Sequence, residues 1–548
     1  MPIFENNEVG SSVRAKINAA ITLGERLQAG AGGVSLYELG YAPADGDVRT
    51  MITAALAVGR SREVIIPYNA APWVSLGEMV VPAGVTISFE PGARIAQNHS
   101  AVPGIRLQAG ARLVRPYLTS TVHARTSMAG AGVPEQTSYQ HNARAIFIDG
   151  ADAAVLDVQM LEYMAGGIVV NAADAVVTNL TARHLRAYSG YAAAIDAKFN
   201  ADRFYITVNN VSDCDRALEP EDGANGRFVA APGVLERIAS GYYHDANNPV
   251  SESFCLSVHS HNDDAAFKPC NGVLFAGSWT CIDCIQPVYF DHSLVIANSD
   301  DYRPLNCHVE EVTIIVTPAY DHAYPRQRTM VMLNGYGCSV KARFVLEAGA
   351  TMPATFQSVM DVGANNRIEL VGPDINMAIP WGDIRVGSVD CEYTVTATRV
   401  TTQPTVPENA GEDHLILLRG AGGRLVRSQI TGVQHRGYVR VDSTAAGFRV
   451  QNCVFRMPTA NAPAAAIRLN GGDDGIISEN AYTDTSNLSQ FVRGLSTTTR
   501  TLVTGNALIR TGAAIVLDSG TAGITVVNNQ LGAATITNSG TNTVTPNY

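Results

Sequence analysis

The chain has 548 residues, of which 46% are hydrophobic and only 16% are charged. It can therefore bury a large core, and this composition excludes an intrinsically disordered protein. A net charge of −11 argues against non-specific binding to nucleic acid and against docking on anionic membranes, both of which require a basic surface.

Two helices are expected at the start of the chain. In the first, Ser12 is the N-cap, an apolar stripe begins at Val13, and glycines from Gly30 onward end the helix. The second is expected over residues 47–58, with Asp47 as its N-cap. The side chains expected to face inward from it are Val48, Met51, Ile52, Ala55 and Leu56.

Beyond residue 58 the helical period is lost and short β-rich runs begin. Residues 64–66 precede Pro67 and are expected to form a buried strand. Residues 79–87 fit a strand, a turn and a second strand, and residues 92–95 open another. Such runs, separated by Gly, Asn and Asp, continue nearly to the C-terminus.

One phrase repeats toward the C-terminal end, and its aligned asparagines are Asn452, Asn480, Asn506 and Asn529. The steps between them shorten from about 28 to about 23 residues, which is typical of the coils of a β-helix with one connecting loop of variable length. Asparagine suits a corner because it tolerates a left-handed backbone and its amide can bond to neighbouring coils. The predicted fold is all-β, a right-handed single-stranded parallel β-helix with a short α-helical N-terminal segment.

Four segments are predicted: an N-terminal helix over residues 1–34, a main β-helix over 35–400, a linker or long loop over 401–415 and a C-terminal β-helix over 416–548. The stretch 401–411, rich in Thr and Pro, fits either a boundary between two β-helices or a loop within one. Residues 519–548 contain no charged side chain and are expected to form a trimerisation region, packed against copies of themselves.

The start of the chain lacks the basic and apolar regions of a secretory signal peptide, and no stretch is apolar enough to span a bilayer. Nine scattered cysteines indicate reduced thiols in a protein made in a cytoplasm. Cys281 and Cys284 form a lone CxxC motif, for which two cysteines on a strand are favoured over a redox or zinc site. No metal ion or other cofactor is expected.

Residues 47–95 resemble the entry of pectate-lyase-like β-helix proteins, in which a helix leads into a strand ending in Pro67, then a Val-Pro-x-Gly-Val turn and a Gly-Ala-x-Ile phrase. Residues 10–18 resemble a segment that begins many tail proteins of tailed bacteriophages. Together they resemble a phage tailspike. This resemblance implies a homotrimer in the virion, made in the host cytoplasm, that attaches to the phage tail or baseplate by its N-terminus and contacts host surface polysaccharide through its side.

Residues 258–268 resemble the Asp-Asp-x-x-x-x-Lys phrase of polygalacturonase-like hydrolases. By that match, Asp263 or Asp264 is the general acid and Lys268 contacts substrate. The chain lacks that family's upstream Asn-Thr-Asp and downstream Gly-His-Gly phrases, so the second carboxylate stays open. Glycoside hydrolysis needs two carboxylates, and coils of a β-helix lie about 4.8 Å apart, so acids one coil apart can face one groove.

Spacing suggests partners for Asp263. Glu236 precedes it and Asp291 follows it, each at a step that matches the C-terminal repeat, and His292 lies beside Asp291. A second acidic cluster, which could supply the base, consists of Glu219, Glu221 and Asp222. The aromatic residues Trp279 and Tyr289 are candidates for stacking against sugars in a groove over residues 215–325. Turn formation and core packing are the alternative explanations for these acids and aromatic residues.

The predicted function is recognition and hydrolysis of host cell-surface polysaccharide, with a lyase less favoured than a hydrolase. The alternative is a non-enzymatic receptor-binding fibre or virion decoration spike that holds glycan through the avidity of three chains. The first predicts release of oligosaccharides and the second predicts binding alone. Neither a nucleic-acid partner nor membrane insertion is expected.

Overall fold

The structure is a computed structural model. It describes residues 33–58, 62–99, 102–120, 144–164, 166–185, 193–198, 200–220, 224, 226–230, 235–243, 253–255, 265–268, 274–282, 287–290, 305–318, 329–350, 357–361, 363–372, 382–397, 414–432, 437–459, 463–495 and 500–548. Across these residues, no helix has both the length and the apolar character needed to cross a bilayer. The chain divides into two compact units, residues 1–261 and 262–548.

The described part of the N-terminal unit begins with strand β1 (Val34–Ser35), the 3-10 helix η1 (Pro43–Asp45) and the helix α2 (Val48–Ala57). The Asp47 carboxylate caps α2, because it accepts a hydrogen bond from the Arg49 backbone N–H at 3.1 Å. The predicted second helix is therefore confirmed, and four of its five expected inward residues are buried, whereas Leu56 is half-buried. The predicted helix starting at Ser12 lies outside the described residues.

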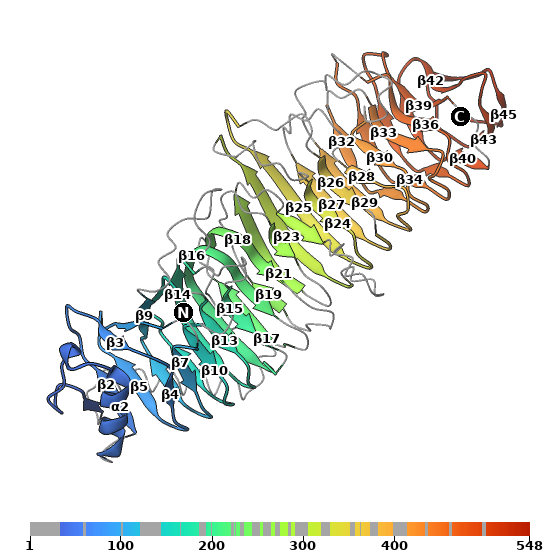
Figure 1. Cartoon of the computed structure of the whole chain (residues 1–548). Coiled ribbons are helices and arrows are strands. Elements are labelled where there is room, and N and C mark those ends of the chain that lie inside the picture. The colour runs from blue at the N-terminus through green and yellow to red at the C-terminus, as the bar shows by residue number, and fades with distance from the viewer. Residues whose placement is uncertain are drawn as a thin grey trace. The chain divides into compact units, whose positions relative to one another are not determined.

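In the N-terminal unit, short strands of each coil pair in parallel with those of the next and form three ladders (Figure 1). The first ladder contains β1, β2 (Glu63–Ile66), β5 (Thr86–Phe89), β8 (Arg112–Val114), β11 (Ala154–Leu156), β17 (Gly226–Ala230) and β19 (Ser253–Cys255). The second contains β3 (Trp73–Ser75), β6 (Ile95–Gln97), β9 (Tyr117–Ser120) and β12 (Met160–Glu162). The third contains β4 (Met79–Val81), β7 (Ile105–Leu107), β10 (Ile146–Ile148), β13 (Ile168–Val170) and β15 (Ala193–Ala197). The long strands β14 (Val176–Arg183), β16 (Phe204–Pro220) and β18 (Leu235–Tyr243) each pass through more than one ladder.

The C-terminal unit repeats this arrangement. One ladder contains β20 (Ala265–Lys268), β22 (Val288–Phe290), β24 (Thr329–Leu333), β26 (Gln357–Asp361), β28 (Gly382–Ile384), β30 (Ile416–Leu418), β33 (Gly437–Asp442), β36 (Ala465–Asn470), β39 (Gln490–Gly494), β42 (Gly512–Leu517) and β44 (Ala534–Asn538). A second contains β21 (Leu274–Ile282), β23 (His308–Val316), β25 (Ser339–Leu346), β27 (Arg367–Gly372), β29 (Glu392–Ala397), β31 (Arg424–Val426), β34 (Arg449–Gln451), β37 (Ile476–Ser478), β40 (Thr501–Thr504), β43 (Ala522–Val527) and β45 (Thr541–Val544). The third contains β32 (Gln429–Thr431), β35 (Val454–Arg456), β38 (Ala481–Thr483) and β41 (Ala507–Ile509). The all-β class and the parallel β-helix predicted from the repeat are confirmed.

Corners between strands fall at residues with a left-handed backbone. The same corner of four successive coils is occupied by Asn452, Glu479, Gly505 and Asn528, with φ of 56°, 58°, 67° and 56°. At Gly505 the lack of a Cβ removes the steric cost of a positive φ. The predicted left-handed corner at Asn452 is confirmed.

The other three asparagines of the repeat are not at that corner, so aligning them with Asn452 was wrong by one position. Asn480, Asn506 and Asn529 follow the corner residue, are fully buried, and share their column with Cys453. The Nδ2 of Asn480 donates to Oδ1 of Asn506 at 2.9 Å, and the Nδ2 of Asn506 donates to Oδ1 of Asn529 at 2.8 Å. The predicted bonding of asparagine amides between coils is therefore confirmed at this neighbouring position.

The two stretches of chain flanking residues 398–413 belong to one set of ladders. Gly382 of β28 pairs in register with Ile416 of β30, and Glu392 of β29 pairs with Arg424 of β31. The parallel pairing therefore runs from one flank to the other without a break, while residues 401–413 lie outside the described residues and their role as a boundary or a loop stays a prediction.

Candidate active site

Most of the site residues predicted from the sequence cannot be placed. Those lying outside the described residues are Glu221, Asp222, Asp263, Asp264, Asp291 and His292. For Glu236 on β18, Lys268 on β20 and Tyr289 on β22 the backbone alone is described. Phe267 pairs with Val288, so Lys268 and Tyr289 are neighbours in the parallel register. Their roles in binding or catalysis remain predictions.

Trp279 has a described side chain, and this side chain lies in the core. Only 1% of its surface is exposed. Its indole Nε1 donates to the Ala276 carbonyl at 3.2 Å, and its ring packs edge-on against Phe275 with centroids 5.6 Å apart. A ring covered in this way presents no face to a sugar, so core packing is the role that the structure gives to Trp279.

Two acids share one position on neighbouring coils of the N-terminal unit. Asp196 of β15 pairs in register with Glu219 of β16, and they are 2% and 6% exposed. Their strands lie about 4.8 Å apart, and parallel pairing directs both side chains to the same face of the ladder. Glu219 belongs to the acidic cluster predicted as a source of the base, whereas Asp196 was not predicted.

Two cations accompany Asp196. The Arg144 Nη2 lies 3.4 Å from its Oδ2, and the Lys198 Nζ lies 3.1 Å from the same oxygen. Arg144 is itself 6% exposed, so this ion pair is screened little by solvent. A Cβ on Gly166 would lie 2.3 Å from the Arg144 Nη1, so glycine there leaves the space that the guanidinium fills. Together these contacts place the Asp196 carboxylate in a buried ion-pair network with Arg144 and Lys198.

A further buried acid, Glu162 of β12, lies on another ladder of the same unit. It accepts hydrogen bonds from the Tyr117 hydroxyl at 2.6 Å and from Nε of Arg183 at 2.7 Å. Burial raises the pKa of Tyr117, and the hydrogen bond to Glu162 raises it further. No second carboxylate is paired with Glu162 in register, because its neighbours are Arg183 in the next coil and a residue of β9 in the previous one. Glu162 therefore lacks the paired acid that hydrolysis requires.

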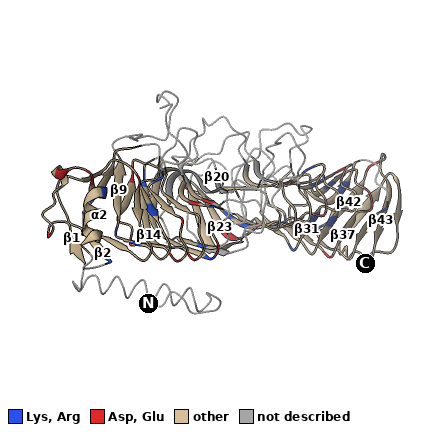
Figure 2. Ribbon diagram, turned by 60° about the horizontal axis from the view of Figure 1, so that its bottom comes forward, with Lys and Arg blue, Asp and Glu red and all other residues tan. Residues whose placement is uncertain are grey.

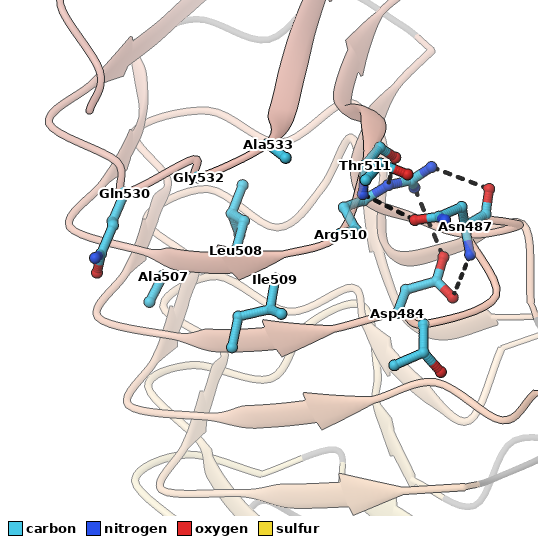
Figure 3. A pocket seen from close by; sticks show the side chains of 11 residues that line it. Asp484, Asn487, Ala507, Leu508, Ile509, Arg510, Thr511, Gln530, Gly532 and Ala533 are labelled. Carbon is cyan, nitrogen blue, oxygen red and sulfur yellow. Dashed lines mark hydrogen bonds and ion pairs between the residues drawn. The ribbon is translucent and has the colours of Figure 1, made fainter.

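A hollow of about 560 Å³ lies near the end of the C-terminal unit (Figure 3). One side is polar, where Arg510 lies 3.8 Å from Asp484 and donates to the Asn487 carbonyl at 3.1 Å. The other side is lined by Ala507, Leu508 and Ile509. Asp484 already accepts hydrogen bonds from the backbone N–H groups of Ser486, Asn487 and Ser489. This acid holds a turn, so the hollow is a weaker catalytic candidate than the Asp196–Glu219 pair.

Within the described part of the chain, no three His, Cys, Asp or Glu side chains gather closely enough to hold a metal ion. The cysteines whose side chains are described are buried free thiols: Cys214, Cys281, Cys307, Cys338, Cys391 and Cys453. Cys281 lies on strand β21, as predicted, and Cys284 lies outside the described residues.

Neither a family model nor a curated protein matches the chain. Among solved structures, it is similar to the catalytic unit of a GH87 alpha-1,3-glucanase from Streptomyces thermodiastaticus, at 12% identity over 94% of this chain and 69% of that one, with a TM-score of 0.21. DFA-IIIase from Arthrobacter chlorophenolicus matches at 10% identity over 94% and 98%, with a TM-score of 0.22. The Streptococcus pneumoniae surface protein and adhesin PfbA matches at 9% identity over 94% and 100%, with a TM-score of 0.21. Similarity at this level assigns no function to the chain.

Proposed function

We propose that the protein binds a polysaccharide and hydrolyses it with Asp196 and Glu219 as the two carboxylates. The observation that carries this proposal is their register: two nearly buried acids on neighbouring coils point to the same face of one ladder. Such a pair is what glycoside hydrolysis requires, and a parallel β-helix supplies it at the spacing of its coils.

The roles are assigned from the contacts of Asp196. Asp196 lies beside the cations Arg144 and Lys198, and on this proposal it acts as the nucleophile or base. Glu219 is then the acid that protonates the leaving glycosidic oxygen as the bond to the anomeric carbon breaks. A coil spacing of about 4.8 Å is close to the carboxylate separation of retaining enzymes. In that mechanism Asp196 forms a glycosyl ester, which a water deprotonated by Glu219 then hydrolyses.

The more specific assignment is a phage tailspike that acts on host cell-surface polysaccharide. It is supported by the resemblances of residues 10–18 and 47–95. On this proposal the protein is a homotrimer, is carried on the virion tail, and attaches to the tail or baseplate by its N-terminus. A trimeric mass measured by light scattering supports it, and a monomeric mass of the full chain contradicts it.

The alternative function is binding without cleavage, and one observation favours it. Asp196 contacts two cations while almost fully covered, as a structural ion pair also would. In that case the protein retains glycan by avidity and Asp196 stabilises the coil stack.

Incubation with a panel of bacterial surface polysaccharides, followed by size and mass analysis of released oligosaccharides, separates these functions. We expect saturated oligosaccharides from the wild type and a loss of about 10³-fold or more in D196N and E219Q. The exposed Asp390→Asn variant is the matched control and should retain full activity. Activity that persists in D196N and E219Q but is lost in D263N/D264N would move the site to the residues predicted from the sequence. Tight binding with no product would establish the adhesin instead.

A further inference from the structure

Three arginines form a column on the C-terminal unit. Arg440 of β33 pairs in register with Arg468 of β36, and Arg468 pairs with Arg493 of β39. Their side chains alternate with buried residues such as Val441 and Leu469, so they point to the outer face of the ladder. We call Arg440, Arg468 and Arg493 the arginine column, and Figure 2 shows basic positions in blue recurring along this unit.

Hydrogen bonds and an ion pair fix the orientation of the guanidinium groups in the column. Nε of Arg440 donates to Asp442 at 2.7 Å, and Nε of Arg468 donates to the neutral amide oxygen of Asn470 at 3.1 Å. Arg493 lies 3.5 Å from Asp518. In each case the partner sits in the adjacent column of the same face, so each guanidinium is oriented before any ligand arrives.

Two more arginines extend the basic surface toward earlier coils. Arg385 and Arg419 both contact the buried carboxylate of Asp383. Asp383 and Leu417 precede Arg440 in register on successive coils, so Arg385 and Arg419, two positions further along the chain, belong to the adjacent column that contains Asp442. Four of these five guanidinium groups contact the carboxylates of Asp383, Asp442 and Asp518, and the fifth contacts the amide of Asn470.

This arrangement has an electrostatic cost. Like charges directly opposite one another on neighbouring strands repel, and here they recur at about 4.8 Å. A linear anion lying along the column would meet one guanidinium at every coil, and the planar guanidinium fork matches carboxylate and sulfate groups.

We propose that the arginine column binds an anionic polysaccharide, with the polymer running across successive coils so that its carboxylate or sulfate groups contact Arg440, Arg468 and Arg493. This proposal adds to the proposed function the charge of the ligand. It rests on the proposed function in one respect, that the ligand is a polysaccharide. Binding at this surface does not require Asp196 or Glu219, so it can be tested without catalysis.

The test is equilibrium binding of full-length E219Q protein to polygalacturonate oligomers, with dextran oligomers of matched length as the neutral probe. We expect binding to polygalacturonate that weakens as salt is raised, and no binding to dextran. Arg468→Gln should weaken binding about tenfold or more, because one charge-assisted contact is lost from the middle of the column. Arg468→Lys keeps the charge but not the planar guanidinium, so its affinity for polygalacturonate should lie between those of the parent and of Arg468→Gln.

The controls are Arg427→Gln and Arg500→Gln, which remove arginines that are more exposed than any in the column, at 71% and 74%. We expect these two variants to bind like the parent. An equal loss in a control and in Arg468→Gln would overturn the proposal, because the effect would then reflect net charge. Equal affinity for dextran, or for an oligothymidylate of matched charge, would also overturn it. If Arg468→Gln fails to fold, Arg493→Gln at the more exposed end replaces it with the same expectation.

Discussion

Asn506 is bonded through its side chain to both neighbouring coils: its Oδ1 accepts from Asn480, and its Nδ2 donates to Asn529 at 2.8 Å. The Asn480 backbone N–H also donates to Asn506 Oδ1 at 3.0 Å, and Asn506 Nδ2 donates to the Ile477 carbonyl at 3.0 Å. One buried amide therefore satisfies polar groups that would otherwise have no partner in the interior of the stack. The ladder continues to Asn547, whose Oδ1 accepts from the backbone N–H of Asn529 at 2.9 Å.

Asn506→Ala should lower the free energy of unfolding by about 2–4 kcal/mol, because it leaves buried backbone and amide groups without partners. The control is Asn452→Gly, which removes an asparagine at an exposed corner where glycine adopts the same positive φ. Its effect should stay within about 0.5 kcal/mol. Chemical denaturation of both variants measures the difference, and equal effects would contradict a stabilising ladder.

The repeat predicted the fold but not the register within it. Asparagine serves two purposes here, at the left-handed corner and in the buried ladder, so aligning Asn452 with Asn480 joined two different columns. Cys453 takes the ladder position in its coil, and its backbone N–H donates to Asn480 Oδ1 at 2.9 Å. An alignment on asparagine alone could not separate these roles, because the corner position and the buried position are adjacent in the same turn.

Asp196 was not predicted as a site residue for a related reason. Partners were sought for Asp263 at the longer steps of the C-terminal repeat, whereas Asp196 and Glu219 lie closer together in the sequence than that. Because loop lengths vary from coil to coil, sequence spacing does not fix which residues pair. Glu236 illustrates this, because its partner in the preceding coil is Ser212 and not an acid. The available signal was an aspartate within the otherwise apolar strand β15, where burial of a charge requires a reason.

The buried ion pair between Arg144 and Asp196 predicts a loss of stability when one partner is removed. Arg144→Met should lower the free energy of unfolding by about 3 kcal/mol, because Asp196 stays buried with one cation contact fewer. The exposed pair of Arg500 and Asp474 is the control, and Arg500→Gln should cause no measurable change. Thermal or chemical unfolding compares the two variants. An unchanged stability in Arg144→Met would show that the pair contributes little to folding.

The N-cap of α2 predicts a dependence of stability on acid pH. Burial alone would raise the pKa of Asp47, but its hydrogen bonds and charge interaction with Arg49 outweigh burial and hold the pKa below 3.8. A carboxyl whose pKa is lowered on folding stabilises the protein above its unfolded pKa, and that contribution is lost as the pH falls through the folded value. Asp47→Ala should cost about 1 kcal/mol at neutral pH, and Asp47→Ser should recover part of it. Unfolding curves at pH 7 and at pH 3 check this, and a cost for Asp47→Ala that does not shrink at pH 3 would contradict it.

Burial of the Cys453 thiol predicts a loss of stability as the pH rises, whereas Asp47 predicts a loss as the pH falls. Burial raises the pKa of its thiol from about 9.0 to about 11, while hydrogen bonds around Ser428 and Gln451 offset part of this rise. A thiol whose pKa is raised on folding contributes stability that is fully present below pH 9 and is lost as the pH rises toward 11. Over that range the wild type should therefore lose about 2–3 kcal/mol more than Cys453→Ala, which has no thiol to titrate. Unfolding curves of both proteins across this pH range measure the difference, and parallel losses would contradict it.

The same burial should protect Cys453 from alkylation, since the thiolate is the reactive form and is scarce well below its pKa. In the native protein at pH 8, iodoacetamide should leave the Cys453 peptide unmodified, and in denaturant it should modify that peptide fully. Mass spectrometry of proteolytic fragments distinguishes Cys453 from the other cysteines of the chain. Rapid labelling of Cys453 in the native state would mean that the column it shares with Asn480 opens readily, which would also weaken the case for the asparagine ladder as a rigid element.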